Sequence, residues 1–246
     1  MSSSLPPRSV TRSAHPLVQA GLTRLRDVQT SSEEFRRHVR EVSMILFIEA
    51  ARELETHTVP VTTSLDSTTG QVLSRRIVLV PILRAGLGMV DGIWPVVPSA
   101  QLAHIGIYRD EMTAAPHPYY SKFGPDLEEA DVFVLDPMLA TGQTAVEAVR
   151  QLKARGVRRL VFICLVAAPE GLAALQAAHP EVPIFTATVD ARLNDQSYIV
   201  PGLGDAGDRY FGTVSDESSV AAVGWSPPVA SDPLAVPGAP RVLISR

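Results

Sequence analysis

The chain has 246 residues, 46% of them hydrophobic, and a formal net charge of -4 at pH 7. That length allows one large domain or two small ones, and the apolar content is ample for a sizeable core. The negative charge argues against a nucleic-acid partner. No apolar run approaches the ~20 residues that a membrane-spanning helix needs. The single cysteine, Cys164, excludes an intramolecular disulfide, and its apolar neighbours predict a core residue. We therefore expect a soluble, cytoplasmic protein with no membrane partner.

The two ends of the chain differ from its middle. Residues 1–14 are rich in Ser and Arg without an apolar segment, which predicts a flexible tail. Residues 226–240 contain five prolines and show no periodicity. We therefore expect one domain over residues 15–214, followed by a proline-rich C-terminal tail over residues 215–246.

The first predicted elements are a long helix and a small β excursion. Ser31 or Ser32 is expected to cap a helix that runs to Leu54, because acidic residues follow in its first turn. Apolar residues recur along it at helical spacing and predict one buried face. Residues 59–77 predict a small β excursion with a turn at residues 69–71.

Strands and helices then alternate. Strands are predicted at residues 77–83, 102–108, 132–135, 159–168 and 184–189. Helices are predicted after Gly88 through Ile93, over 145–153 and over 170–179. Residues 114–124, with two prolines and two adjacent tyrosines, predict an irregular flap or hairpin. This order indicates an α/β fold, a mostly parallel sheet with helices on both faces.

One strand-to-helix loop has the features of a phosphate cradle. Asp136 follows the strand over residues 132–135, and small and hydroxyl residues lead from it into the next helix. A loop that enters a helix presents unpaired N–H groups, and the helix dipole adds positive potential there. An ordinary strand–turn–helix unit would show the same pattern, so this loop needs support from other segments.

Three further segments supply that support. In an open α/β sheet, ligands bind beyond the carboxyl ends of the strands. The loop of Arg84, the strand end at Arg109, the 136–144 loop and a glycine-rich loop over 202–207 should meet there. Arginine forks bind phosphate oxygens, whereas Asp136 suits sugar hydroxyls or a developing cation. Two phosphate sites around one carboxylate predict a sugar with a phosphate at one end and a pyrophosphate at the other.

The motifs themselves resemble those of one family. Asp136-Pro137-Met138-Leu139-Ala140-Thr141-Gly142 is similar to the 5-phosphoribosyl 1-pyrophosphate (PRPP) loop of uracil phosphoribosyltransferases. Residues 82–88 and 198–208 resemble two other signatures of that family, and the similarity runs from about His15 to Thr213. The resemblance implies a type I phosphoribosyltransferase fold, a twisted, mostly parallel sheet flanked by helices with a small hood or β-hairpin excursion. It implies the conversion of uracil and PRPP to UMP and pyrophosphate in pyrimidine salvage, with Mg²⁺ as cofactor.

The resemblance also implies residue roles. Arg84 and Arg109 would bind the leaving pyrophosphate, Asp136 would stabilise the ribose, and Asp205 would lie near the Mg²⁺–PRPP complex; these four are the expected catalytic residues. The residues expected to bind PRPP are Arg84, Arg109, Asp136, Pro137, Met138, Leu139, Ala140, Thr141, Gly142, Gln143, Thr144 and Asp205. The residues expected to bind uracil, largely through main-chain groups, are Ile199, Gly204, Asp205 and Ala206.

One position departs from the family pattern. The family usually has two glycines after the threonine and then a serine, whereas this chain has Gly142-Gln143-Thr144. If position 143 needed a left-handed backbone, glutamine would cost roughly 1–2 kcal/mol there. Otherwise its amide adds a donor for the phosphate.

Two alternative functions stay open at this point. The same scaffold could serve as a regulatory protein that uses the nucleotide site to control an RNA or protein partner, or the enzyme could act on a purine or orotate. Family members commonly self-associate, so we expect a homodimer or larger homo-oligomer, with GTP as a candidate activator. Residues 109–122 are a candidate lid over the substrate.

Overall fold

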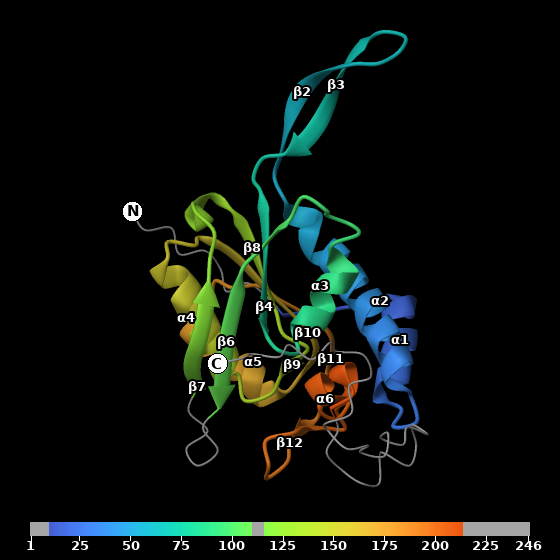
Figure 1. Cartoon of the computed structure of the whole chain (residues 1–246), viewed down its shortest axis with the longest axis vertical. Helices are drawn as coiled ribbons and strands as arrows, with labels where there is room; N and C mark the ends of the chain where they lie inside the picture. Colours follow the sequence, from blue (N-terminus) through green and yellow to red (C-terminus); the bar gives the residue numbers. More distant parts are fainter. Residues whose placement is uncertain (1–9, 110–115, 214–246) are drawn as a thin grey trace, which may run out of the picture. The chain divides into compact units, whose positions relative to one another are not determined.

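The computed structural model describes residues 10–109 and 116–213 (Figure 1). All of these residues belong to one unit, which ends at Thr213. The predicted C-terminal tail, residues 215–246, lies outside the described part of the chain.

In the described residues, nine strands form one sheet. Its main path runs β1 (Val10–Arg12), β11 (Ile184–Val189), β10 (Arg159–Ala167), β8 (Asp131–Leu135), β4 (Ile77–Leu83), β6 (His104–Arg109) and β7 (Pro116–Lys122). Two short strands, β5 (Gln101–Leu102) and β9 (Met138–Leu139), pair with β4 and β10. Every pair is parallel except β6 with β7. The predicted mostly parallel sheet is confirmed.

Helices cover both faces of this sheet (Figure 1). One core lies between the sheet and α1 (Pro16–Arg26), α2 (Ser32–Ala50), α3 (Leu87–Ile93) and α6 (Ala206–Phe211). The other lies between the sheet and α4 (Gln143–Ala154) and α5 (Pro169–Ala178). Side chains alternate along each strand, so Phe133 belongs to the first core and Val132 to the second. Apolar residues on both faces of the strands therefore require two helical layers.

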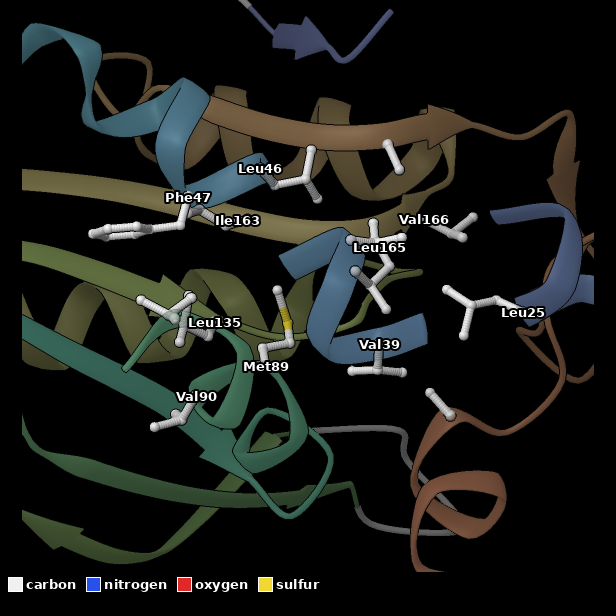
Figure 2. Close-up of a cluster of buried hydrophobic side chains, with 14 of the residues drawn as sticks. Leu25, Val39, Leu46, Phe47, Met89, Val90, Leu135, Ile163, Leu165 and Val166 are labelled. Carbon is white, nitrogen blue, oxygen red and sulfur yellow. The ribbon is translucent and has the colours of Figure 1, made fainter. Parts of the chain in front are cut away.

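The first core is close-packed at the centre of the sheet (Figure 2). Leu46 and Phe47 of α2 and Met89 of α3 meet Leu135 and Ile163 there. All five side chains are 2% exposed or less. Each such burial contributes about 1.5–3 kcal/mol relative to exposure, so this layer fixes α2 and α3 on the strands whose ends carry the predicted site.

The predicted helices are largely confirmed. Ser31 caps α2 by accepting a hydrogen bond from Glu34 N at 3.2 Å. The α-helix ends at Ala50, before the predicted Leu54, and continues as a 3₁₀ turn, η1 (Ala51–Glu53). The helix predicted over 145–153 is α4, and its apolar residues at helical spacing are buried: Ala145, Ala148, Val149 and Leu152.

One hairpin forms a two-stranded sheet separate from the nine-stranded sheet. β2 (Thr56–Thr62) and β3 (Ser67–Leu73) form an antiparallel pair, which confirms the β excursion. The predicted turn at residues 69–71 is wrong, because these residues lie inside β3. The turn is at residues 63–66, where Thr63 Oγ1 accepts from Asp66 N at 3.0 Å and its main-chain N donates to Asp66 O at 2.9 Å. A hydroxyl that bonds the local backbone determines this turn.

The predicted flap over 114–124 contains a regular strand. β7 pairs antiparallel with β6 from Pro116 to Lys122, which makes this part a hairpin. Residues 110–115, in the N-terminal half of the candidate lid, lie outside the described residues. A 3₁₀ turn, η2 (Leu127–Glu129), leads from this hairpin into β8.

The predicted flexible tail, residues 1–14, is wrong at its C-terminal end. Val10–Arg12 form β1, which pairs parallel with β11, and Ser13 N donates to Thr186 O at 2.9 Å. The edge of the sheet offers these residues backbone partners that their composition does not reveal. Among the described residues, no helix combines the length and the apolar character that crossing a bilayer requires.

Candidate active site

A pocket of about 290 Å³ opens beyond the carboxyl ends of β4 and β8. It is lined by Arg84, Ala85, Asp136, Met138, Ala140, Ser197, Tyr198, Ile199, Gly204, Asp205, Ala206 and Gly207. α6 lies at this end of the sheet, away from the β2–β3 hairpin (Figure 1). Three of the four predicted segments therefore meet at one pocket. The fourth, Arg109, is the last residue of β6, the neighbour of β4; its side chain lies outside the described part of the structure.

Asp136 leads a loop that is tied to the sheet. Its Oδ1 accepts a hydrogen bond from Met138 N at 3.1 Å. The carbonyl oxygen of Pro137 accepts from both Leu165 N and Val166 N at 3.1 Å. Met138 and Leu139 then form β9 against β10. The Met138 N–H group thus orients the carboxylate, and the contacts of Pro137 and β9 hold the loop backbone against β10.

The loop enters α4 through a left-handed residue. Gly142 has φ +81° and is the N-cap, and Val146 N donates to its carbonyl oxygen at 2.9 Å. Gln143 is the first helical residue, and the described non-glycine residues with positive φ are Asp126 and Ser197. Gln143 therefore has a helical backbone, and the energetic cost expected for a left-handed glutamine is not incurred. Six of the residues expected to bind PRPP belong to this loop and do not line the pocket: Pro137, Leu139, Thr141, Gly142, Gln143 and Thr144.

The Arg84 loop lies directly against the end of β8. A Cβ on Gly86 would lie 2.3 Å from the carbonyl oxygen of Leu135, the residue before Asp136, so only glycine fits there. The Arg84 guanidinium faces α6, with Nη2 3.7 Å from Asp208 Oδ1 and its centre 5.8 Å from that of the Phe211 ring. The side chain is 63% exposed, so it can exchange this weak contact for an anion.

The glycine-rich segment is a loop only in its first part. The prediction of a shaped loop over 202–207 is wrong at its end, because α6 begins at Ala206 and includes Gly207. Asp205 Oδ1 caps the helix by accepting from Asp208 N at 2.9 Å. Gly202 and Gly204 have positive φ, +61° and +76°. A capping carboxylate thus starts a helix where glycine content alone argues against one.

The site includes residues that the sequence did not single out. Ser197 and Tyr198 line the pocket from the connection between two short strands, β12 (Arg192–Leu193) and β13 (Ile199–Val200). Ser197 has φ +64°, and Asn194 Oδ1 accepts from Tyr198 N at 2.8 Å. Asn194 followed by Asp195 is a turn signal that could have located this connection. Ala85 and Gly207 complete the lining through the adjoining loops.

The thiol of Cys164 belongs to the core and not to the pocket. Cys164 is fully buried in β10, and burial raises the pKa of its thiol to about 12. The prediction of a core residue is confirmed. The described residues contain no group of three or more His, Cys, Asp or Glu side chains arranged to hold a metal ion. Two carboxylates, Asp136 and Asp205, line the pocket.

Known structures place this architecture in a class. The AQ2163 protein from Aquifex aeolicus superposes with a TM-score of 0.81 at 38% identity, covering 85% of this chain and all of that one (100%). An adenine phosphoribosyltransferase from Trypanosoma brucei, in complex with AMP, pyrophosphate and ribose 5-phosphate, shares the fold with a TM-score of 0.50 at 15% identity, over 80% of this chain and 89% of its own. The fold is that of a type I phosphoribosyltransferase.

Sequence comparison narrows the class to one family. The family model for uracil phosphoribosyltransferase matches residues 12–213. A uracil phosphoribosyltransferase from Caulobacter sp. strain K31 is 53% identical over 207 residues, 84% of this chain and 99% of that protein. One from Anoxybacillus flavithermus is 50% identical over 200 residues, 81% of this chain and 96% of that protein. The chain belongs to the uracil phosphoribosyltransferase family.

Proposed function

We propose that the chain transfers the phosphoribosyl group of PRPP to uracil and releases UMP and pyrophosphate. The observation that carries this proposal is the convergence of Arg84, Asp136 and the loop before α6 on one pocket. Each comes from a different part of the sequence, and together they supply a cation, an acid and exposed main-chain groups. Family membership supports the choice of uracil as the base.

The acid acts on the sugar. When pyrophosphate leaves C1 of the ribose, the ring develops positive charge, so a carboxylate held below the ring stabilises the transition state electrostatically. Asp136 fits this role because the Met138 N–H contact fixes its carboxylate in the pocket. A prepositioned charge needs no reorganisation during the reaction, and no covalent intermediate is required.

The phosphates bind on either side of this acid. The loop over 140–144 holds the 5-phosphate, since it leads into the N-terminus of α4, where main-chain N–H groups and the helix dipole favour an anion. Each charge-assisted bond there contributes about 1.5–3 kcal/mol. Arg84 and Arg109 bind the pyrophosphate. For Arg84 this means exchanging its contact with Asp208, 3.7 Å away, for phosphate oxygens.

Main-chain groups read the base. Ile199, Gly204 and Ala206 line the pocket together with Asp205, on the side formed by the loop and α6. The edge of uracil alternates carbonyl and N–H groups, which peptide groups can pair with. Cytosine presents an amino group where uracil has a carbonyl oxygen, so a donor in the site would face another donor, and the site would reject cytosine.

The residues of the pocket fit a Mg²⁺ ion that enters with the substrate. Mg²⁺ is usually bound through one or two carboxylates together with substrate phosphates rather than by a protein cage. Asp205, with Asp136, offers that number of carboxylates, and we propose Asp205 as the residue nearest the metal. The ion would neutralise charge on the departing pyrophosphate.

A panel of bases tests the proposal. Purified protein with Mg²⁺ and PRPP is offered uracil, cytosine, orotate, adenine and hypoxanthine, and pyrophosphate release and nucleotide products are measured. We expect UMP from uracil and little release with the other bases. Pyrophosphate release with orotate or a purine, but not with uracil, would show that uracil is not the substrate base. Uracil-dependent binding of RNA with no nucleotide formed would instead support a regulatory protein.

Three finer properties stay predictions. The family resemblance implies a homodimer or larger homo-oligomer and makes GTP a candidate activator, and composition and charge predict a cytoplasmic location. Light scattering of the purified chain gives its oligomeric state. Titration of GTP into the UMP-forming assay, with ATP as the matched control, shows whether a purine nucleotide raises the rate.

A further inference from the structure

Arg26 and Asp190 form a partly buried ion pair next to the loop that precedes α6. Arg26 is the last residue of α1, and Asp190 directly follows β11. The pair is bidentate, with Nη2 2.6 Å from Asp190 Oδ1 and Nη1 2.8 Å from Oδ2. The Asp190 side chain is 4% exposed and that of Arg26 is 26% exposed. Neither residue lines the pocket, so neither would contact the substrates in the proposed reaction.

Both members of the pair also hold Gly202. Gly202 N donates to Asp190 Oδ2 at 2.7 Å, and its carbonyl oxygen accepts from Arg26 Nη1 at 2.8 Å. At φ +61°, a Cβ on Gly202 would lie 2.2 Å from the carbonyl oxygen of Ile199. The ion pair therefore fixes the peptide groups of Gly202 against Ile199, one of the proposed base readers.

A second guanidinium holds the next residue of the same loop. Arg209 Nη1 donates to Leu203 O at 2.8 Å and also to Leu25 O, and Nη2 donates to Asp27 O at 2.6 Å. The group lies over the Phe35 ring, 4.4 Å from its centre. The carbonyl oxygens of Gly202 and Leu203 are thus both bound by guanidinium groups at the end of α1, and the chain enters the pocket at Gly204.

We propose that Arg26 and Asp190 are positioning residues for base recognition. They hold the loop in the shape in which the main-chain groups of Ile199, Gly204 and Ala206 face the base; this inference rests on the proposed function. The phosphate loop is tied to β10 by separate contacts of Pro137. Asp205, which we propose nearest the metal, has a contact of its own, because it accepts a hydrogen bond from Asp208 N at 2.9 Å. A change in the ion pair should therefore alter uracil binding much more than PRPP binding.

The test replaces Arg26 with lysine. Lysine keeps the positive charge but cannot bind a carboxylate and a carbonyl oxygen with one planar fork. We expect Arg26→Lys to raise KM for uracil by about tenfold, the effect of losing one such contact. KM for PRPP and kcat should stay within about twofold, which is within the scatter of a neutral change. The rate with cytosine relative to uracil should rise, because a looser loop discriminates less.

Arg24→Lys is the matched control. Arg24 lies on the same helix, in its last turn, and is exposed, so both KM values should match those of the unmodified chain. Asp190→Asn removes the other partner and should show the same selective rise for uracil. Arg209→Lys tests the loop independently, since it weakens the Leu203 contact and leaves the ion pair intact; if Asp190→Asn does not fold, the two lysine variants decide.

The outcomes separate the two proposals. If the unmodified chain forms no UMP, the proposed function is wrong. If it forms UMP and Arg26→Lys behaves like Arg24→Lys, the positioning role is wrong and the function stands. An equal rise in both KM values, with a lowered melting temperature, would show a general structural role and would also overturn the inference.

Discussion

Gly142 and Gly171 lie where the 136–144 loop packs against α5, and neither has room for a side chain. A Cβ on Gly142 would lie 2.7 Å from the carbonyl oxygen of Gly171, and a Cβ on Gly171 would lie 2.4 Å from that of Ala140. Gly142 caps α4, and Gly171 lies near the start of α5. The shape of the proposed phosphate loop therefore depends on a glycine in the next helix of the same layer.

Replacing Gly171 with alanine should displace this loop. The new methyl group would meet main-chain oxygens of Leu139 and Ala140, which cannot move aside as a flexible side chain can. We expect the free energy of unfolding to fall by about 1–3 kcal/mol, and KM for PRPP to rise more than KM for uracil. Thermal melting and steady-state kinetics measure the two effects.

Gly124→Ala serves as the control for this prediction. A Cβ at Gly124 would lie 3.7 Å from Gln101 Oε1, an ordinary contact, so stability and both KM values should stay unchanged. A Gly171→Ala protein with the same stability and KM for PRPP as the unmodified chain would contradict the close approach.

Cys164 should be unreactive while the chain is folded. Its side chain is 0% exposed, and burial raises the pKa of the thiol to about 12. Since the thiolate is the reactive form, a disulfide reagent at neutral pH should react only as fast as the protein opens. Labelling in native buffer and in denaturant measures this; one thiol per chain should appear on unfolding. Rapid labelling of the native protein would place Cys164 outside the core.

His179 should make stability depend on pH. The residue is 8% exposed, with Nδ1 2.9 Å from Lys153 Nζ and Nε2 3.2 Å from Val146 O. Burial, and then the charge of Lys153, lower the pKa of His179 below the ordinary 6.5. Near that pH the unfolded chain binds more protons than the folded one. The contribution of neutral His179 to the free energy of unfolding is therefore complete above about pH 6.5. It is lost as the pH falls through the pKa that His179 has in the folded chain.

Melting temperatures between pH 8 and pH 5 test this prediction. His179→Gln removes the titrating group, while its amide can still donate to Val146 O. Its melting temperature should therefore fall less steeply with acid than that of the unmodified chain. Parallel curves for the two proteins would show that His179 does not titrate in this range.

The sheet and the site loops could be predicted because their signals are local. Apolar runs such as Ile77–Leu83 match the strand bounds, and a carboxylate or arginine directly after a strand must lie at its carboxyl edge. The loop of Arg84, the glycine-rich loop over 202–207 and the acid Asp136 therefore suffice to place the pocket. The buried face of α4 follows equally from helical spacing.

The remainder depends on contacts between distant residues or on single capping groups. Arg26 and Asp190 pair across the fold, and no spacing rule relates them. α6 begins because the Asp205 side chain caps it, although glycine at 207 argues against a helix. Ser197 adopts φ +64° in a turn held by Asn194. Each of these features is decided by the assembled structure rather than by local composition.

The central claim concerns Asp136, and replacing it with asparagine tests that claim most directly. Asparagine keeps an oxygen that can accept from Met138 N, as Asp136 Oδ1 does at 3.1 Å, so the loop should keep its shape and the melting temperature should not change. The charge below the ribose is lost. We expect UMP formation from uracil and PRPP to slow by ~10²-fold or more. Turnover by Asp136→Asn near the rate of the unmodified chain would contradict the assignment of this carboxylate to the reaction.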